Sequence, residues 1–187
     1  MIGSSFRDPS GYLFVRDGVL YRKVNDIYKT NYIRLMGAGL YADLVGRKLL
    51  IPHEEVGQGI LKPELIEFIS YPYEWCFSQL KDAALLTLEI QKIALEYGMM
   101  LKDASAYNVQ FHNGKPIFID TLSFEIYRDG MPWVAYKQFC EQFLAPLALM
   151  AYKDERLSQL LRIYIDGIPL DLAKSLLPFN ARFNTGL

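Results

Sequence analysis

Residues 101–120 read LKDASAYNVQFHNGKPIFID, and this stretch indicates more about the fold than any other part of the sequence. Asp103 begins a polar loop, Asn108 follows five positions later, and Asp120 ends the second of two short apolar segments. An Asn-Gly dipeptide separates these segments and is the dipeptide most typical of a two-residue β-hairpin turn. Because a hairpin returns the chain on itself, the pattern predicts that Asp120 lies close to Asn108.

Two carboxylates and a carboxamide in this arrangement suit the transfer of a phosphoryl group. One carboxylate can accept or orient the proton of an attacking hydroxyl. The carboxamide and the second carboxylate offer hard oxygen ligands to Mg²⁺, which neutralises phosphate charge. Each side chain alone also fits a structural role in a turn, so the interpretation depends on their joint spacing.

A long helix is predicted over residues 77–97, directly before this loop. The segment is rich in strong helix formers, contains no Gly or Pro, and is followed by Gly98 as a C-terminal cap. It is apolar nearly all round from Ala83 to Leu88, which predicts a buried central helix with Leu88 in the core. Further helices are expected at the end of the chain, over about residues 134–151, 154–165 and 169–177.

The front of the chain reads as strands with one helix. A hairpin is predicted over residues 12–24 around an Asp-Gly turn, followed by a helix over 30–48. Short strands are expected at the segments LLIP, GILKP and ELIEFIS within residues 49–70. The Pro- and aromatic-rich segment YPYEW, residues 71–75, reads as a linker. We therefore predict an α+β protein with two unequal lobes: a small β-rich N-lobe over 1–70, a hinge-like linker, and a helical C-lobe over 76–187.

Composition narrows the classes of partner. The chain has 187 residues, 51% of them hydrophobic, and a formal net charge of −1. The chain lacks the net positive charge that favours binding to nucleic acid. No segment approaches the roughly 20 consecutive apolar residues of a membrane-spanning helix. The scarcity of cysteine, with only Cys76 and Cys140, favours a reducing, cytoplasmic location.

The stretch Leu101–Asn108 is similar to the catalytic loop of protein kinases, H-R-D-L-x-x-x-N, and IDTL at 119–122 resembles the strand end and Asp of D-F-G. This resemblance implies a protein-kinase-like fold of the small-molecule kinase type that binds ATP and Mg²⁺. It makes Asp103 the catalytic residue and Asn108 and Asp120 the metal ligands. It also makes YPYEW the hinge that holds the nucleotide, with Tyr73 and Trp75 as contacts.

The sequence departs from the kinase motifs at several positions, both before and after the linker. Leu101 stands where the family has His, Thr121-Leu122 replaces Phe-Gly, and no Gly-rich loop precedes the first hairpin. The lysine of the second strand has two candidate replacements, Arg22 and Lys23, which alternation places on opposite faces. The acidic residue that pairs with this lysine in the family would here be Asp43, with Glu54-Glu55 as the alternative.

A second resemblance covers the whole chain. The segments SFRDPSGYLF, LLIPHEEV and SYPYEWCFSQLKDAALLTLEIQ are similar to the front portion of bacterial nodulation-related proteins catalogued as SAM-dependent methyltransferases. In such proteins a methyltransferase domain would follow this segment, beyond residue 187. The glycines at 37–39 and 57–59 do not form the loop of a cofactor-binding strand and helix, so these residues predict no methyl transfer.

Two functions follow as hypotheses. The first is a phosphotransferase that phosphorylates a hydroxyl of a small molecule or sugar, because few residues follow Asp120 to dock a protein substrate. The second is a catalytically silent kinase-like module that binds a nucleotide or serves as a scaffold for a methyltransferase domain. A metal-dependent hydrolase built on Asp103 and Asp120 is a weaker third hypothesis, because no His ligand lies near them in the sequence.

Overall fold

The computed structural model describes residues 8–179 and opens with the predicted β-hairpin. Strands β1 (Gly11–Arg16) and β2 (Val19–Val24) pair antiparallel from Gly11 with Val24 to Arg16 with Val19. The turn between them is Asp17-Gly18, whose φ angles of 53° and 76° match the left-handed geometry of a two-residue hairpin turn. The hairpin prediction is confirmed. The parts of the predicted lobes at 1–7 and 180–187 lie outside the described residues.

The helix predicted over 30–48 is divided in two. Helix α1 (Lys29–Gly37) and helix α2 (Leu40–Gly46) are separated by Ala38 and Gly39. Gly39 has a φ of 86°, a left-handed conformation that ends the first helix and that glycine adopts at little cost. The two short helices therefore meet at an angle, and each buries leucines in the core.

Two further strands complete a four-stranded antiparallel sheet of order β1-β2-β4-β3. Strand β4 (Ile60–Pro63) is the predicted GILKP segment, and strand β3 (His53–Gly57) pairs with it. The strands predicted at LLIP and ELIEFIS are wrong. Leu50 forms only an isolated bridge to Phe118, and residues 64–70 pair with no strand and expose Leu65, Phe68 and Ile69.

The long helix is present as α3 (Phe77–Glu96), and Gly98 follows it with a φ of 68°. Strand β5 (Met99–Leu101) comes next and pairs antiparallel with β8 (Phe124–Ile126). Between them lies the second predicted hairpin, β6 (Val109–His112) and β7 (Lys115–Phe118), which turns at Asn113-Gly114. The loop that carries Asp103 thus lies between β5 and β6.

The end of the described chain is helical, as predicted. Helix α4 (Tyr136–Phe139) continues through a π-helical turn (Cys140–Leu144) into α5 (Ala145–Tyr152). Helices α6 (Leu160–Ile163) and α7 (Leu170–Leu176) follow, and a 3₁₀ turn precedes α6. Among the helices within residues 8–179, none combines the length and apolar character needed to cross a membrane.

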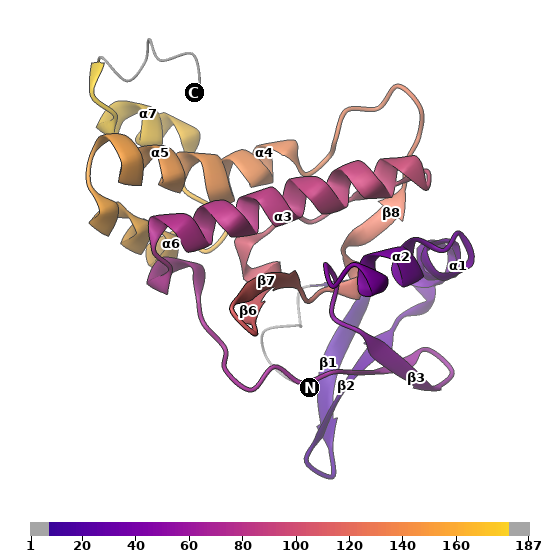
Figure 1. The fold of residues 1–187 in the computed structure, drawn as a ribbon. Helices are drawn as coiled ribbons and strands as arrows, with labels where there is room; N and C mark the ends of the chain where they lie inside the picture. The colour runs from indigo at the N-terminus through magenta and orange to yellow at the C-terminus, as the bar shows by residue number, and fades with distance from the viewer. Residues whose placement is uncertain (1–7, 180–187) are drawn as a thin grey trace.

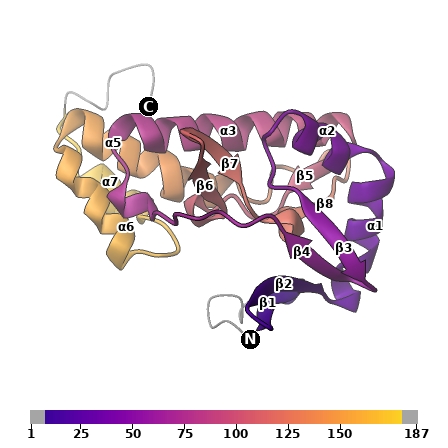
Figure 2. The same cartoon turned by 60° about the horizontal axis from the view of Figure 1, so that its bottom comes forward.

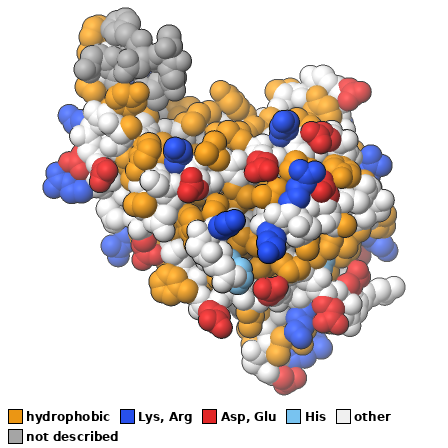
Figure 3. Space-filling view, in the orientation of Figure 1, with side chains coloured by type: hydrophobic (Ala, Val, Ile, Leu, Met, Phe, Trp, Pro, Cys, Tyr) orange, Lys and Arg blue, Asp and Glu red, His pale blue; other side chains and the backbone are white. Residues whose placement is uncertain are grey.

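Helix α3 runs along the molecule, with the sheet and α1–α2 near one end and α4–α7 near the other (Figures 1 and 2). The main core forms where its inner face meets β5, β7 and α5. The predicted burial of Leu88 is wrong, since this side chain is 41% exposed. Leu85 and Leu95 are exposed as well, and Figure 3 shows hydrophobic side chains among charged ones on the face that α3 crosses. Helix α3 is therefore buried on one side only.

Candidate functional site

Arg22 in β2 joins two carboxylates. Its Nη2 atom is 2.9 Å from Asp8 Oδ2 and 3.0 Å from Asp120 Oδ1. The side chains of Arg22, Asp8 and Asp120 are 14%, 29% and 13% exposed, so water screens these charges weakly. Arg22 Nε is buried without a hydrogen-bond partner. The ion pair with Asp120 connects the four-stranded sheet to the loop that follows β7.

Asp120 is fixed by the turn that it begins. Its Oδ1 accepts a hydrogen bond from the backbone N–H of Leu122 at 3.0 Å, and its Oδ2 accepts from the Ser123 hydroxyl at 2.7 Å. These bonds cap a 3₁₀ turn over Thr121–Ser123, the role that an Asp before a short helix commonly takes. The carboxylate is therefore held in one orientation before any ligand arrives.

Asn108 shares the hydroxyl of Ser123 with Asp120. Its Nδ2 donates to Ser123 Oγ at 3.2 Å, and its backbone carbonyl accepts from the N–H of Ile119 at 2.8 Å. The hairpin thus brings Asn108 and Asp120 together, as the spacing predicted. Because the amide nitrogen makes the bond to Ser123, the amide oxygen is the atom of Asn108 that suits a metal ion.

Asp103 is held on the helical side of the loop. Its Oδ1 accepts from the N–H of Ser105 at 3.0 Å and from Gln138 Nε2 at 2.8 Å. The Gln138 side chain also accepts from the N–H of Ala104 at 2.7 Å, so one glutamine of α4 clamps both residues. A glutamine that holds carboxylate and backbone together limits the rotation of Asp103.

Lys102 and Tyr28 lie beside the charged cluster formed by Arg22, Asp8 and Asp120. The Lys102 ammonium donates to Ser10 Oγ at 2.5 Å and lies 5.0 Å from the centre of the Tyr28 ring. The Tyr28 hydroxyl donates to the carbonyl of Phe124 at 2.7 Å. Burial raises the pKa of Tyr28, and the nearby charge of Asp120 raises it further. The site therefore holds two cations, Arg22 and Lys102, against two carboxylates.

The choice between Arg22 and Lys23 is decided by the register of β2. Arg22 points to Asp120, whereas Lys23 lies on the opposite face and donates to the carbonyl of Gln58 at 2.9 Å. The acidic partners considered for Arg22 are engaged elsewhere. Asp43 pairs with Arg47 and Tyr97, and Glu55 accepts from Tyr32 and from the backbone of Gly59. The additional partner of Arg22 is Asp8.

Tyr73 and Trp75 do not join this group. Trp75 is buried in the main core, where its ring packs edge-on against Phe111 and its Nε1 donates to Ser70 Oγ at 2.9 Å. Tyr73 packs against the cluster formed by the C-terminal helices and stacks on Tyr71 with ring centres 5.4 Å apart. The linker is thus tied into the helical end of the molecule.

His53 of β3 contacts α1, α2 and Thr121. Its Nδ1 is 3.4 Å from Thr121 Oγ1, its Nε2 is 3.3 Å from the Tyr32 hydroxyl, and its ring packs on Tyr41. Burial lowers the pKa of His53 to about 4. The imidazole is therefore neutral at ordinary pH and serves the contact between sheet and helices.

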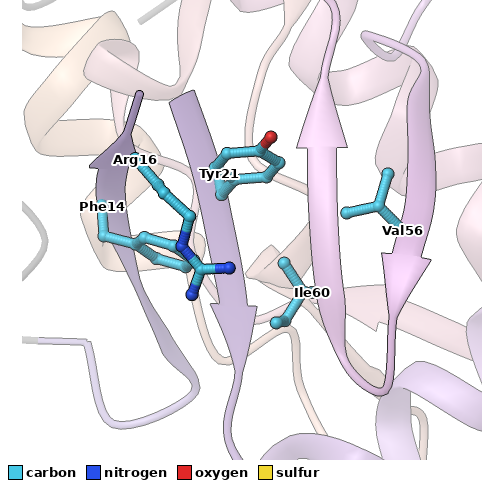
Figure 4. A pocket seen from close by; sticks show the side chains of 5 residues that line it. All are labelled: Phe14, Arg16, Tyr21, Val56 and Ile60. Atoms are coloured by element: carbon cyan, nitrogen blue, oxygen red, sulfur yellow. The ribbon is translucent and has the colours of Figure 1, made fainter. Parts of the chain in front are cut away.

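Two hollows of the described surface are lined by residues other than Asp103 and Asp120. One, of about 220 Å³, is on the outer face of the sheet, where Arg16 lies over the ring of Phe14 beside Tyr21 (Figure 4). Another, of about 450 Å³, lies between α1, β8 and residues 128–134. The candidate site is instead a packed cluster of charges.

The donor atoms present suit Mg²⁺ in part. Within residues 8–179, no group of three or more His, Cys, Asp or Glu side chains is arranged to hold a metal ion. Asn108 and Asp120 nevertheless give two oxygen donors joined through Ser123, and Mg²⁺ is commonly bound by one or two carboxylates together with phosphate oxygens and water. The chemistry of these donors therefore fits Mg²⁺ carried by a phosphate ligand.

Three contributors to the site were not predicted as site residues from the sequence. Asp8 lies in a turn-like segment before the hairpin, Ser123 lies in the turn after Asp120, and Gln138 lies in a distant helix. Their roles depend on contacts with residues 14 to 35 positions away, or on the path of a turn. The sequence DPSG is typical of a turn, so it indicates that Asp8 is a turn residue but not that it pairs with Arg22.

No family model matches the sequence. The chain is similar to the nodulation protein NoeA of Rhizobium meliloti (strain 1021), with 38% identity over 179 residues, which are 90% of this chain and 37% of NoeA. The chain therefore spans little more than a third of the length of this relative. The expectation of a nodulation-related relative is confirmed.

Proposed function

We propose that this domain is a kinase-like phosphotransferase that binds ATP with Mg²⁺ and phosphorylates a hydroxyl of a small molecule or sugar. The observation that carries the proposal is the ion pair between Arg22 of the sheet and Asp120 of the turn, next to Asn108. A cation and oxygen ligands at one point are what a triphosphate with its metal requires. The proposal includes a two-lobed kinase-like fold, supported by a sheet with two helices that precedes a linker and a long helix.

Each side chain has a role in this proposal. Arg22 would contact phosphate oxygens, and Asn108 and Asp120 would hold Mg²⁺, which supplies positive charge to the phosphates. Asp103 would orient the acceptor hydroxyl and take its proton as the oxygen attacks the γ-phosphorus. The bond from that phosphorus to the bridging oxygen breaks, and ADP leaves. Gln138 keeps the Asp103 carboxylate in place for this step.

A second candidate is a catalytically silent module. Two observations favour it: Asp8 already forms an ion pair with Arg22, and the two hollows of about 220 and 450 Å³ lie elsewhere. The greater length of NoeA adds support, because the module would then serve as a scaffold within a larger protein. The resemblance of this chain to nodulation-related proteins catalogued as methyltransferases suggests that the larger protein would carry a methyltransferase domain. The thiols of Cys76 and Cys140 are free, which is consistent with a cytoplasmic location.

The test compares Asp120→Asn, Asp103→Asn and the control Asp82→Asn, which changes an exposed carboxylate of α3. ATP binding is measured by isothermal titration with and without Mg²⁺, and ADP release is measured over a panel of sugar acceptors. Asp120→Asn should weaken Mg²⁺-dependent binding at least about tenfold, because it removes the anionic metal ligand. Asp103→Asn should bind normally but lose turnover.

The outcomes separate the two candidates. Binding of ATP that is indifferent to both Mg²⁺ and Asp120→Asn contradicts the phosphotransferase. Mg²⁺-dependent binding without ADP release over the whole panel supports the silent module. Asp82→Asn should match the wild type in every measurement, and its failure to do so would show that the effects are not specific to the site.

A further inference from the structure

The Asp8 carboxylate lies where an anionic ligand of Arg22 would lie. Its Oδ2 is 2.9 Å from Arg22 Nη2, and its Oδ1 accepts from the N–H of Ser10 at 2.9 Å. A cationic guanidinium and a backbone N–H that converge on two oxygens form the usual environment of a bound phosphate group. Here the chain's own carboxylate fills that environment.

The backbone that carries Asp8 is firmly attached. Asn25 donates two hydrogen bonds to this segment, from its N–H to the carbonyl of Ser10 at 2.8 Å and from Nδ2 to the carbonyl of Pro9 at 3.0 Å. Gly11 lies so close to β2 that an added Cβ would be 2.1 Å from the carbonyl oxygen of Lys23. The backbone of residues 9–11 is therefore held against β2 and Asn25, so displacement of Asp8 from Arg22 requires only rotation of its side chain.

Lys102 adds a second cation at the same place. Its ammonium donates to the hydroxyl of Ser10, whose N–H is bonded to Asp8. Rotation of the Asp8 side chain would leave Arg22 Nη2, the N–H of Ser10 and the ammonium of Lys102 around one space. Two positive charges and one N–H would then face a ligand, with Asp120 as the remaining carboxylate.

We propose that Asp8 is an internal substitute for a phosphate group, and that it regulates the site by competing with polyphosphate ligands for Arg22 and the N–H of Ser10, beside Lys102. This inference rests on the proposed function because both involve Arg22. It concerns the binding of an anion alone and requires neither Mg²⁺ nor phosphoryl transfer. Loss of the Asp8 charge removes the competitor and opens the site.

The test measures binding of sodium tripolyphosphate without Mg²⁺ by isothermal titration. Asp8→Asn keeps the size of the side chain and the acceptor for Ser10 but removes the charge. We expect it to bind tripolyphosphate about tenfold more tightly than the wild type, the effect of one charge-assisted hydrogen bond. The control Asp17→Asn changes an exposed carboxylate of the neighbouring turn, where Asn tolerates the φ of 53°. It should bind as the wild type does.

A second measurement uses the wild type alone, and a third uses a double variant. In the wild type labelled with ¹⁵N, tripolyphosphate should shift the amide resonance of Ser10 and the Nε–H resonance of Arg22, while the Asp17 amide stays unchanged. The double variant Asp8→Asn with Arg22→Gln should lose the gain in affinity. Both results would support competition at this site.

The contrary results are separate from those that concern ATP. Equal affinities of wild type and Asp8→Asn for tripolyphosphate, or no binding to either at millimolar concentration, overturn the inference. Equal gains from Asp8→Asn and Asp17→Asn also overturn it, because they indicate a general effect of charge. If Asp8→Asn binds tripolyphosphate more tightly while no protein binds ATP in a Mg²⁺-dependent way, the inference is supported and the proposed phosphotransferase is contradicted.

Discussion

Replacing Arg22 by Met tests whether the ion pair between sheet and turn is buried and structural. Met keeps an unbranched apolar chain of similar length but removes the charge, so packing changes little. The change leaves Asp120 only 13% exposed and without its cation. The remaining hydrogen bonds from Leu122 and Ser123 compensate only part of that loss.

The size of the effect follows from the burial of the two partners. Removing one partner of a fully buried ion pair costs about 3–5 kcal/mol. Because Arg22 and Asp120 retain 14% and 13% exposure, we expect Arg22→Met to lower the free energy of unfolding by roughly 2–4 kcal/mol. Arg47→Met is the matched control, since Arg47 is 52% exposed and pairs with Asp43 at 2.7 Å. A surface pair of this kind contributes less than about 1 kcal/mol.

Urea denaturation followed by circular dichroism gives the free energy of unfolding for each variant. The cycle of Arg22→Met, Asp120→Asn and the double variant isolates the interaction, and we expect a coupling of at least about 1 kcal/mol. A loss within about 0.5 kcal/mol of the wild type for Arg22→Met would refute the reasoning. A loss equal to that of Arg47→Met would refute it as well.

Two further predictions concern burial. Ile90→Ala should lower the free energy of unfolding by about 2–5 kcal/mol, because Ile90 is fully buried. Leu88→Ala should lower it by no more than about 1 kcal/mol, because Leu88 is 41% exposed. Equal losses in urea denaturation would contradict the one-sided burial of α3. Burial holds the pKa of His53 at about 4, below the ordinary 6.5, so the unfolded chain takes up a proton first and stability falls as pH decreases from 6.5 towards 4. His53→Gln should show a shallower fall between pH 7 and pH 5, and an unchanged pH dependence would contradict this cause.

Several elements were predictable because the signal lies within a few residues. Asp17-Gly18 and Asn113-Gly114 both adopt positive φ, and each turn fixes the register of the strands beside it. Helix α3 follows from uninterrupted helix formers closed by Gly98. The same locality explains why Asn108 and Asp120 were expected together, since one hairpin connects them.

Other features depended on what packs against what. Strand β3 has the polar sequence HEEVG and pairs with β4, whereas the apolar segment ELIEFIS pairs with no strand. An apolar run all round α3 predicted burial on every side. The helix has neighbours along one face only, so Leu88 remains in contact with solvent.

The sequence by itself determined the two hairpins, the long helix, and the presence of Asp103, Asn108 and Asp120 in one loop and hairpin. Only the tertiary structure decided that Arg22 rather than Lys23 meets Asp120, because strand alternation gives two faces and packing chooses between them. It also brought Asp8 to Arg22 and Gln138 to Asp103. Such contacts join residues far apart in the chain, and no local pattern encodes them.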